Sequence, residues 1–236
     1  MRLLLISNST TPGEPYLDYP KHEIQKFIGE KSVNALFIPY AAVTFSFNTY
    51  ESKVEERFAE IGHHVTSIHH FADPVEAVRN AEAIVVGGGN TWQLVRMMHD
   101  NAVMEAIKIK VEQGTSYIGW SAGSNVACPT LRTTNDMPII DPKGFDCMNL
   151  VPFQINPHYL DANPEGHGGE TREQRIEEFL EVNPEITVVG LREGTMLKYE
   201  DNKLILIGSR SARIFTKGAV PKELSAGDDF GFLLNH

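Results

Sequence analysis

The chain has 236 residues, of which 42% are hydrophobic and 22% are charged, and its formal net charge is −10. A chain of this length can bury one sizeable core, so we expect a single catalytic domain over residues 1–236. The negative charge and the lack of any Lys/Arg block argue against nucleic acid or an acidic membrane surface as the partner.

Short apolar runs alternate with amphipathic segments through the first half of the chain. The predicted strands are residues 3–6, 35–38, 64–68, 83–86 and 116–118. The predicted helices are residues 18–27, 50–61, 74–80, 91–98 and 103–113. This alternation indicates right-handed βαβ units, and therefore an α/β fold with a doubly wound, mostly parallel sheet.

The pattern changes after residue 127, where loops rich in Asn, Asp, Pro and Gly predominate. One helix is predicted over residues 172–182, and four strands over residues 186–189, 196–199, 203–207 and 212–215. Turn signals separate some of these strands. We expect them to extend the first sheet in the antiparallel direction.

Gly119-Trp120-Ser121-Ala122-Gly123 follows a predicted strand and has the pattern of a nucleophile elbow. Such a turn strains the backbone of its serine and needs small residues two positions before and after it. Residues 122–127 are then expected to begin a helix whose free N–H groups face a developing oxyanion. The segment predicts acyl transfer through Ser121.

Gly87-Gly88-Gly89-Asn90-Thr91 lies between a predicted strand and a predicted helix, at the carboxyl end of the sheet. Consecutive glycines let backbone N–H groups converge on an anion, although a simple tight turn capped by Asn90 or Thr91 fits equally well. The run lacks the spacing of a dinucleotide or nucleoside triphosphate motif. No metal motif is present either, so we expect hydrolysis without a metal or any other cofactor.

A serine nucleophile requires a general base and an acid that orients it. His158, held after Pro157, is favoured as the base over His167, which lies among glycines. For the acid, Glu193 follows a predicted strand and Asp136 lies in a polar loop. With Asp136 the chain order is that of α/β-hydrolases, and spacing alone leaves both acids open.

The strings LLLISNST, GGGNT, GWSAGSN, RTTNDMPI, NPHY, PEGH and GETREQRI, in this order along the chain, closely resemble the peptidase E family of α-aspartyl dipeptidases. The resemblance implies a fold like that of class I glutamine amidotransferases, with a triad in the order nucleophile, His, acid. That order favours Glu193 over Asp136. Matched by motif, Ser121 resembles the family's nucleophile, His158 its base and Glu193 its acid.

The same resemblance implies cleavage of dipeptides that begin with aspartate, and cyanophycinase is a relative. The backbone N–H groups of Gly89 and Ala122 are then expected to hold the oxyanion. Arg172 is the candidate for the β-carboxylate of the substrate, because a guanidinium can grip a carboxylate with two parallel bonds. Asn90 and Asp136 are expected to help fix the substrate.

Three alternatives remain open at this point. They are a cyanophycinase-like hydrolase, an esterase or amidase that uses Asp136, and a protein that only binds a small anion in the glycine run. Two cysteines give no disulfide framework and the start shows no secretory signal, so we expect a cytoplasmic protein. We expect a small acidic dipeptide as the partner and a monomer or small homo-oligomer.

Overall fold

A computed structural model describes residues 1–166 and 168–234 of the chain, and its first sheet has seven strands in the order β3-β2-β4-β5-β1-β8-β9. Five of these strands are mutually parallel: β1 (Arg2–Ile6), β2 (Asn34–Ile38), β3 (His64–Ser67), β4 (Ala83–Val86) and β5 (Ser116–Trp120). The antiparallel strands β8 (Met196–Glu200) and β9 (Lys203–Ile207) continue it beyond β1. The predicted α/β class and mostly parallel sheet are confirmed.

Helices cover both faces of this sheet. Leu4 and Ile6 of β1 pack into one core cluster, together with α1 (Lys21–Ile28) and α2 (Phe47–Glu60). Leu3 and Leu5 point into the other cluster, with α3 (Pro74–Asn80), α4 (Thr91–Asp100) and α5 (Val103–Glu112). Because side chains alternate across a strand, both faces of these short strands are apolar and buried.

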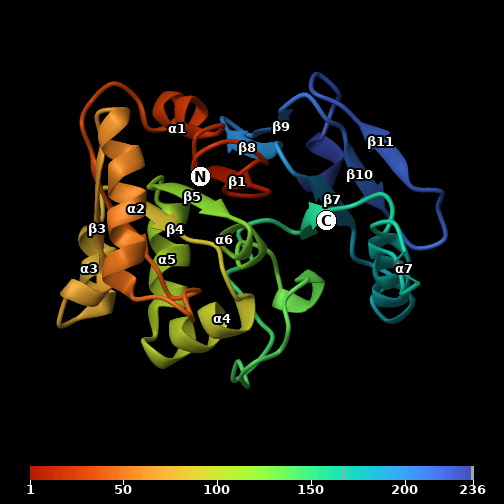
Figure 1. Cartoon of the computed structure of the whole chain (residues 1–236), viewed down its shortest axis with the longest axis horizontal. Helices are drawn as coiled ribbons and strands as arrows, with labels where there is room; N and C mark the ends of the chain where they lie inside the picture. Colours follow the sequence, from red (N-terminus) through yellow and green to blue (C-terminus); the bar gives the residue numbers. More distant parts are fainter. Residues whose placement is uncertain (167, 235–236) are drawn as a thin grey trace.

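A second sheet of four strands stands beside the first, in the order β11-β10-β7-β6 (Figure 1). Its strands are β6 (Gln154–Tyr159), β7 (Val188–Arg192), β10 (Ala212–Phe215) and β11 (Lys222–Leu224). β6 and β7 are parallel, and α7 (Arg172–Val182) packs on this sheet through Ile176 and Leu180. A capping box between Thr171 and Gln174 fixes the start of α7.

The expectation of one continuous sheet is therefore wrong for β7 and β10, since only β8 and β9 extend the first sheet. The chain changes sheets at the turn between β7 and β8, and strand patterns do not encode which partner a strand chooses. β6 and β11 were not predicted as strands. None of the helices within residues 1–166 and 168–234 combines the length and the apolar character that a membrane span requires.

Several helices begin a few residues away from the positions predicted from the sequence. The helix predicted from residue 50 begins at Phe47, because the Ser46 side chain accepts a hydrogen bond from the Thr49 N–H and caps the helix there. The helix predicted from residue 18 begins at Lys21, after Pro20. The described chain also contains short 3₁₀ helices at Ile68–His70, Leu131–Thr133 and Gly231–Leu234.

Candidate active site

Ser121 lies in the sharp turn between β5 and the single helical turn α6 (Ala122–Asn125), which is shorter than predicted. Its backbone has φ 53° and ψ −113°, a conformation that costs free energy for a residue with a Cβ. A Cβ on Gly119 would lie 2.4 Å from the Gly123 carbonyl oxygen, and a Cβ on Gly123 would lie 2.1 Å from the Val86 carbonyl oxygen. The two glycines of the motif are thus required by close approach of the backbone.

His158 projects toward Ser121 from the irregular end of β6. The β6–β7 register shifts between Pro157 and Tyr159, and His158 has a φ of 53°. Its Nε2 lies 2.9 Å from Ser121 Oγ, and its Nδ1 lies 2.7 Å from Glu193 Oε1. Glu193 favours the tautomer with the proton on Nδ1, so that Nε2 is free to accept the serine proton.

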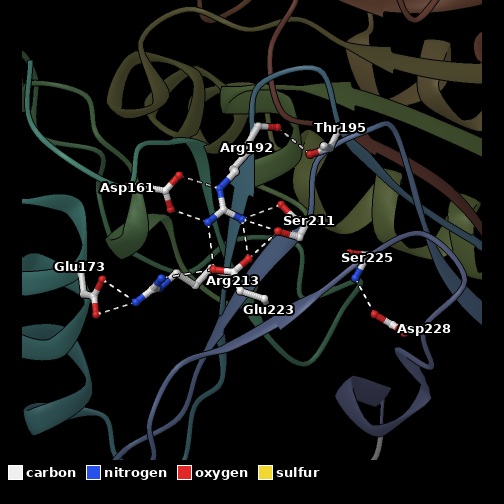
Figure 2. Close-up of polar contacts among 9 residues, drawn as sticks. All are labelled: Asp161, Glu173, Arg192, Thr195, Ser211, Arg213, Glu223, Ser225 and Asp228. Atoms are coloured by element: carbon white, nitrogen blue, oxygen red, sulfur yellow. Dashed lines mark hydrogen bonds and ion pairs between the residues drawn. The ribbon is translucent and has the colours of Figure 1, made fainter.

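Glu193 directly follows β7, where Arg192 anchors the chain. Arg192 is 7% exposed and pairs with Asp161, Glu223 and the Ser211 carbonyl oxygen, as Figure 2 shows. The hydrogen bonds from Arg192 are the main cause that lowers the pKa of Glu223 to about 2. A buried guanidinium with this many partners fixes the end of β7, and with it the starting point of the Glu193 side chain.

Two polar residues after β1 join the two sheets next to His158 and Glu193. The Ser7 hydroxyl donates to the Leu191 carbonyl oxygen at 2.7 Å and accepts from the His158 N–H at 3.0 Å. Asn8 Oδ1 accepts from the Gly194 N–H at 2.9 Å, one residue beyond Glu193. These bonds fix the position of the candidate nucleophile on the first sheet relative to the base and acid on the second sheet.

The glycine run after β4 lies beside Ser121, and the Tyr50 hydroxyl donates to the Gly88 carbonyl oxygen at 2.8 Å. In a trans peptide the next N–H points away from that carbonyl, so this hydrogen bond also sets the direction of the Gly89 N–H. Among the described residues, the backbone N–H groups of Gly89 and Ala122 have no hydrogen-bond partner. Burial raises the pKa of Tyr50 to about 12, which keeps its hydroxyl a donor.

A cavity of about 330 Å³ opens on one side of Ser121 and His158, and it contains Arg172 and Asp136. Arg172, the first residue of α7, forms no ion pair or side-chain hydrogen bond with any residue that the structure describes. Burial is the main cause that lowers its pKa, Arg175 lowers it further, and the charge of Asp136 partly opposes this shift. Burying the guanidinium of Arg172 costs free energy, and an anionic ligand beside it would offset that cost.

Asp136 uses one carboxylate oxygen, Oδ2, to accept from the Thr91 N–H at 2.7 Å and from the hydroxyls of Thr91 and Thr134. Its other oxygen has no partner among the described residues. Asn90 caps α4 by accepting from the Gln93 N–H and also donates to the Met137 carbonyl oxygen. Asn90 therefore holds the loop that carries Asp136.

Of the two candidate acids, the structure brings Glu193 to His158 and joins Asp136 to the start of α4 instead. His167, the competing base, lies outside the described residues. A second cavity of about 420 Å³ shares Ser121, His158 and Asp136 with the first. A larger one, about 550 Å³, lies around Asn34, Thr66 and α3 and contains none of the candidate site residues.

The sequence did not single out Ser7, Asn8, Tyr50 or Arg192. Ser7 and Asn8 carried a usable signal, because polar residues directly after a buried parallel strand lie at the edge where ligands bind. Tyr50 gave none, since it occupies an ordinary apolar position of an amphipathic helix. Its bond to Gly88 spans 38 residues.

In the described chain, one group of side chains has ligand atoms close enough for a metal ion: Glu51, His69 and His70, within 4.8 Å of one another. These atoms already have partners in the protein. His70 Nε2 lies 2.6 Å from Glu51 Oε2, and His69 contacts the Ser67 hydroxyl and the Asn48 amide oxygen. None of the three residues lines a cavity at Ser121.

Known proteins with similar sequences are peptidases. The model of peptidase family S51 matches residues 3–207. Peptidase E of Nostoc sp. is 52% identical over 99% of this chain and 96% of its own length. Peptidase E of Salmonella typhimurium is 47% identical over 98% of this chain and 100% of its own length.

Two solved structures have a similar fold. A peptidase from an acI-B1 Actinobacterium superposes with a TM-score of 0.70 at 18% identity, covering 97% of this chain and 96% of that chain. A putative peptidase E protein from Listeria monocytogenes gives a TM-score of 0.64 at 19% identity, over 88% of this chain and 98% of that chain. Together with the sequence matches, which span nearly the full length, these findings show that the chain is a peptidase of family S51.

Proposed function

We propose that this peptidase is a serine dipeptidase that hydrolyses dipeptides with an amino-terminal aspartate. The observation that carries the proposal is the position of the His158 ring, with Ser121 Oγ 2.9 Å from one nitrogen and Glu193 Oε1 2.7 Å from the other. Both distances are within hydrogen-bond reach, as a nucleophile, base and orienting acid require.

In the proposed reaction Ser121 Oγ attacks the carbonyl carbon of the aspartyl residue while His158 Nε2 takes the hydroxyl proton. The N–H groups of Gly89 and Ala122 stabilise the negative oxygen of the tetrahedral intermediate. His158 then gives the proton to the leaving amine, and the peptide C–N bond breaks. Water, deprotonated by His158, hydrolyses the aspartyl ester and regenerates Ser121.

The charges in the smaller cavity support aspartate as the first residue. An amino-terminal aspartate carries a carboxylate on its side chain and an ammonium group on its Cα. For the carboxylate, Arg172 supplies a half-buried cation that forms no ion pair or side-chain hydrogen bond with the residues the structure describes. Asp136 offers its second oxygen to the ammonium group. A cavity that contains one charge of each sign next to Ser121 suits both groups of the substrate.

A panel of Asp-Leu, Asn-Leu, Glu-Leu and Ala-Leu tests this proposal, with Ser121→Ala as the inactive variant and Ser52→Ala as the matched control. Ser52 is an exposed serine of α2. We expect Asp-Leu to be cleaved with the highest kcat/KM, and Ser121→Ala to lower kcat by at least about 10³-fold. Preference for Ala-Leu would refute the proposed specificity, and near-normal turnover by Ser121→Ala would refute the nucleophile.

A comparison of Glu193→Gln with Asp136→Asn separates the proposed triad from the esterase or amidase alternative. Glu193→Gln is expected to lower kcat by about 10²- to 10⁴-fold, because the amide no longer stabilises the protonated imidazole. Asp136→Asn is expected to act mainly on KM. The reverse pattern would assign the acid to Asp136. A cyanophycinase-like hydrolase would instead cleave β-aspartyl-arginine and leave Asp-Leu intact.

A further inference from the structure

The second cavity at Ser121 differs in chemistry from the one that holds Arg172. Its volume is about 420 Å³, and its walls include the aromatic rings of Tyr16, Phe45 and Tyr50. Phe45 is 41% exposed, and its ring meets that of Tyr50 edge-on at a centroid distance of 5.2 Å. An exposed apolar ring beside a candidate nucleophile is a suitable surface for a variable side chain.

Among the described residues, Lys53 is the only lysine that lines either of the two cavities next to Ser121. It lies on α2 one turn beyond Tyr50, and its Nζ is 5.5 Å from the centroid of the Phe45 ring. It forms no ion pair with any carboxylate in the described chain, although the formal net charge is −10. An ammonium group in this position is free to receive an anion.

The two cavities can be assigned by the charges of the substrate. The first residue of Asp-Xaa carries both an anion and a cation, and the cavity with Arg172 and Asp136 offers the opposite charge to each. The second residue carries one carboxylate and a side chain of varied type. The second cavity shares Asp136 with the first, and it adds Lys53 and exposed aromatic surface, which suit that pair of groups.

We propose that Lys53 binds the terminal carboxylate of the dipeptide, and that the side chain of the second residue lies against Phe45. This inference rests on the proposed function of the site. In a dipeptide the terminal carboxylate lies one residue beyond the scissile bond, a span of about 4 Å. Each residue added to the peptide would move that carboxylate ~3.3 Å farther from the scissile bond, and so away from Lys53. Lys53 thus selects dipeptides over longer chains.

The test compares hydrolysis of Asp-Leu and of its carboxyamide, Asp-Leu-NH₂, which lacks the terminal charge. The variants are Lys53→Met and Lys53→Arg, with Lys31→Met as the matched control. Lys31 is an exposed lysine in the loop before β2 and lines neither cavity at Ser121. All three changes fall on exposed side chains, so the variants are expected to fold.

The parental enzyme should prefer Asp-Leu over its amide by roughly 2- to 5-fold in kcat/KM, the scale of one exposed ion pair. Lys53→Met should remove this preference by slowing Asp-Leu alone, while Lys53→Arg and Lys31→Met keep it. Phe45→Ala should reduce the ratio of Asp-Leu to Asp-Ala hydrolysis.

Equal effects of Lys53→Met on the acid and the amide, or no effect on either, would overturn the assignment of Lys53. An unchanged Asp-Leu to Asp-Ala ratio in Phe45→Ala would overturn that of Phe45. In both cases the proposed function would stand, because the parental enzyme still cleaves Asp-Leu. If the parental enzyme cleaves neither Asp-Leu nor its amide, the proposed function fails and this inference fails with it.

Discussion

The Tyr50 hydroxyl is the most informative single group to remove, because it connects the candidate oxyanion site to the buried core. It donates to the Gly88 carbonyl oxygen at 2.8 Å and accepts from Trp120 Nε1 at 3.2 Å, and Tyr16 Oη lies 3.1 Å away. Tyr50 is 3% exposed and Trp120 is fully buried. In Tyr50→Phe the Gly88 carbonyl and the Trp120 N–H lose a partner that water cannot easily replace.

Each buried group left without a partner costs about 1–3 kcal/mol, and Tyr50→Phe leaves two such groups, so it should lower the free energy of unfolding by roughly 2–6 kcal/mol. The Gly88–Gly89 peptide would also lose the bond that sets its direction. Complete loss of one oxyanion donor costs about 10²- to 10³-fold in kcat. A donor that is still present but less well oriented should cost about 10-fold.

The assay is steady-state hydrolysis of Asp-Leu together with urea unfolding, with Tyr40→Phe as the control. Tyr40 is 3% exposed, and its hydroxyl has no hydrogen bond within the described chain. Tyr50→Phe should lower kcat with little change in KM, because the bond acts through a donor used in the transition state. A destabilised Tyr50→Phe with unchanged kcat would refute the role of Tyr50 in orienting Gly89.

Three further predictions concern the surroundings of the triad. Arg172→Met should raise KM for Asp-Leu by about 10- to 100-fold, the scale of a charge-assisted hydrogen-bonded pair, and should leave the midpoint of thermal unfolding nearly unchanged. An unchanged KM would show that Arg172 does not bind substrate. Ser7→Ala should lower the free energy of unfolding by about 2–6 kcal/mol and should also lower kcat, since the His158 N–H and the Leu191 carbonyl lose their shared partner. Normal kcat in folded Ser7→Ala would limit Ser7 to a structural role. The folded-state pKa of Glu223 is about 2 against an ordinary 4.5, so its stabilising effect is complete above pH 4.5 and is lost as the pH falls toward 2. Glu223→Gln should therefore flatten the dependence of unfolding free energy on pH in that range, and an unchanged slope would contradict the pairing with Arg192.

The sequence predicted those parts of the fold that local patterns encode. The parallel strands of the first sheet are short apolar runs between helices, and α3 and α7 begin and end at the predicted residues. β6 was missed because Asn156, Pro157 and His158 interrupt its apolar pattern, and proline is uncommon inside strands. The second sheet was missed because the pairing of β7 with β6 depends on contacts that are distant in the sequence.

In the candidate site, too, the sequence predicted the local motifs but not the contacts between distant segments. The elbow around Ser121 and the glycine run are local motifs, and both lie where the sequence predicted. The choice between Glu193 and Asp136 was left to a family resemblance, because each acid follows its own turn and only the folded chain shows which one reaches His158. Ser7, Tyr50 and Arg192 act on the site through bonds across the fold, which no window of the sequence contains.

Labelling with a fluorophosphonate, followed by Asp-Leu hydrolysis on the same samples, tests whether Ser121 is the nucleophile that cleaves Asp-Leu. We expect one label per chain on Ser121, loss of Asp-Leu hydrolysis in proportion to labelling, and slower labelling when Asp-Leu is present. We also expect that His158→Ala is not labelled, because the serine then lacks its base. Label on a different residue, or full labelling of Ser121 with Asp-Leu hydrolysis retained, would show that Ser121 is not the nucleophile.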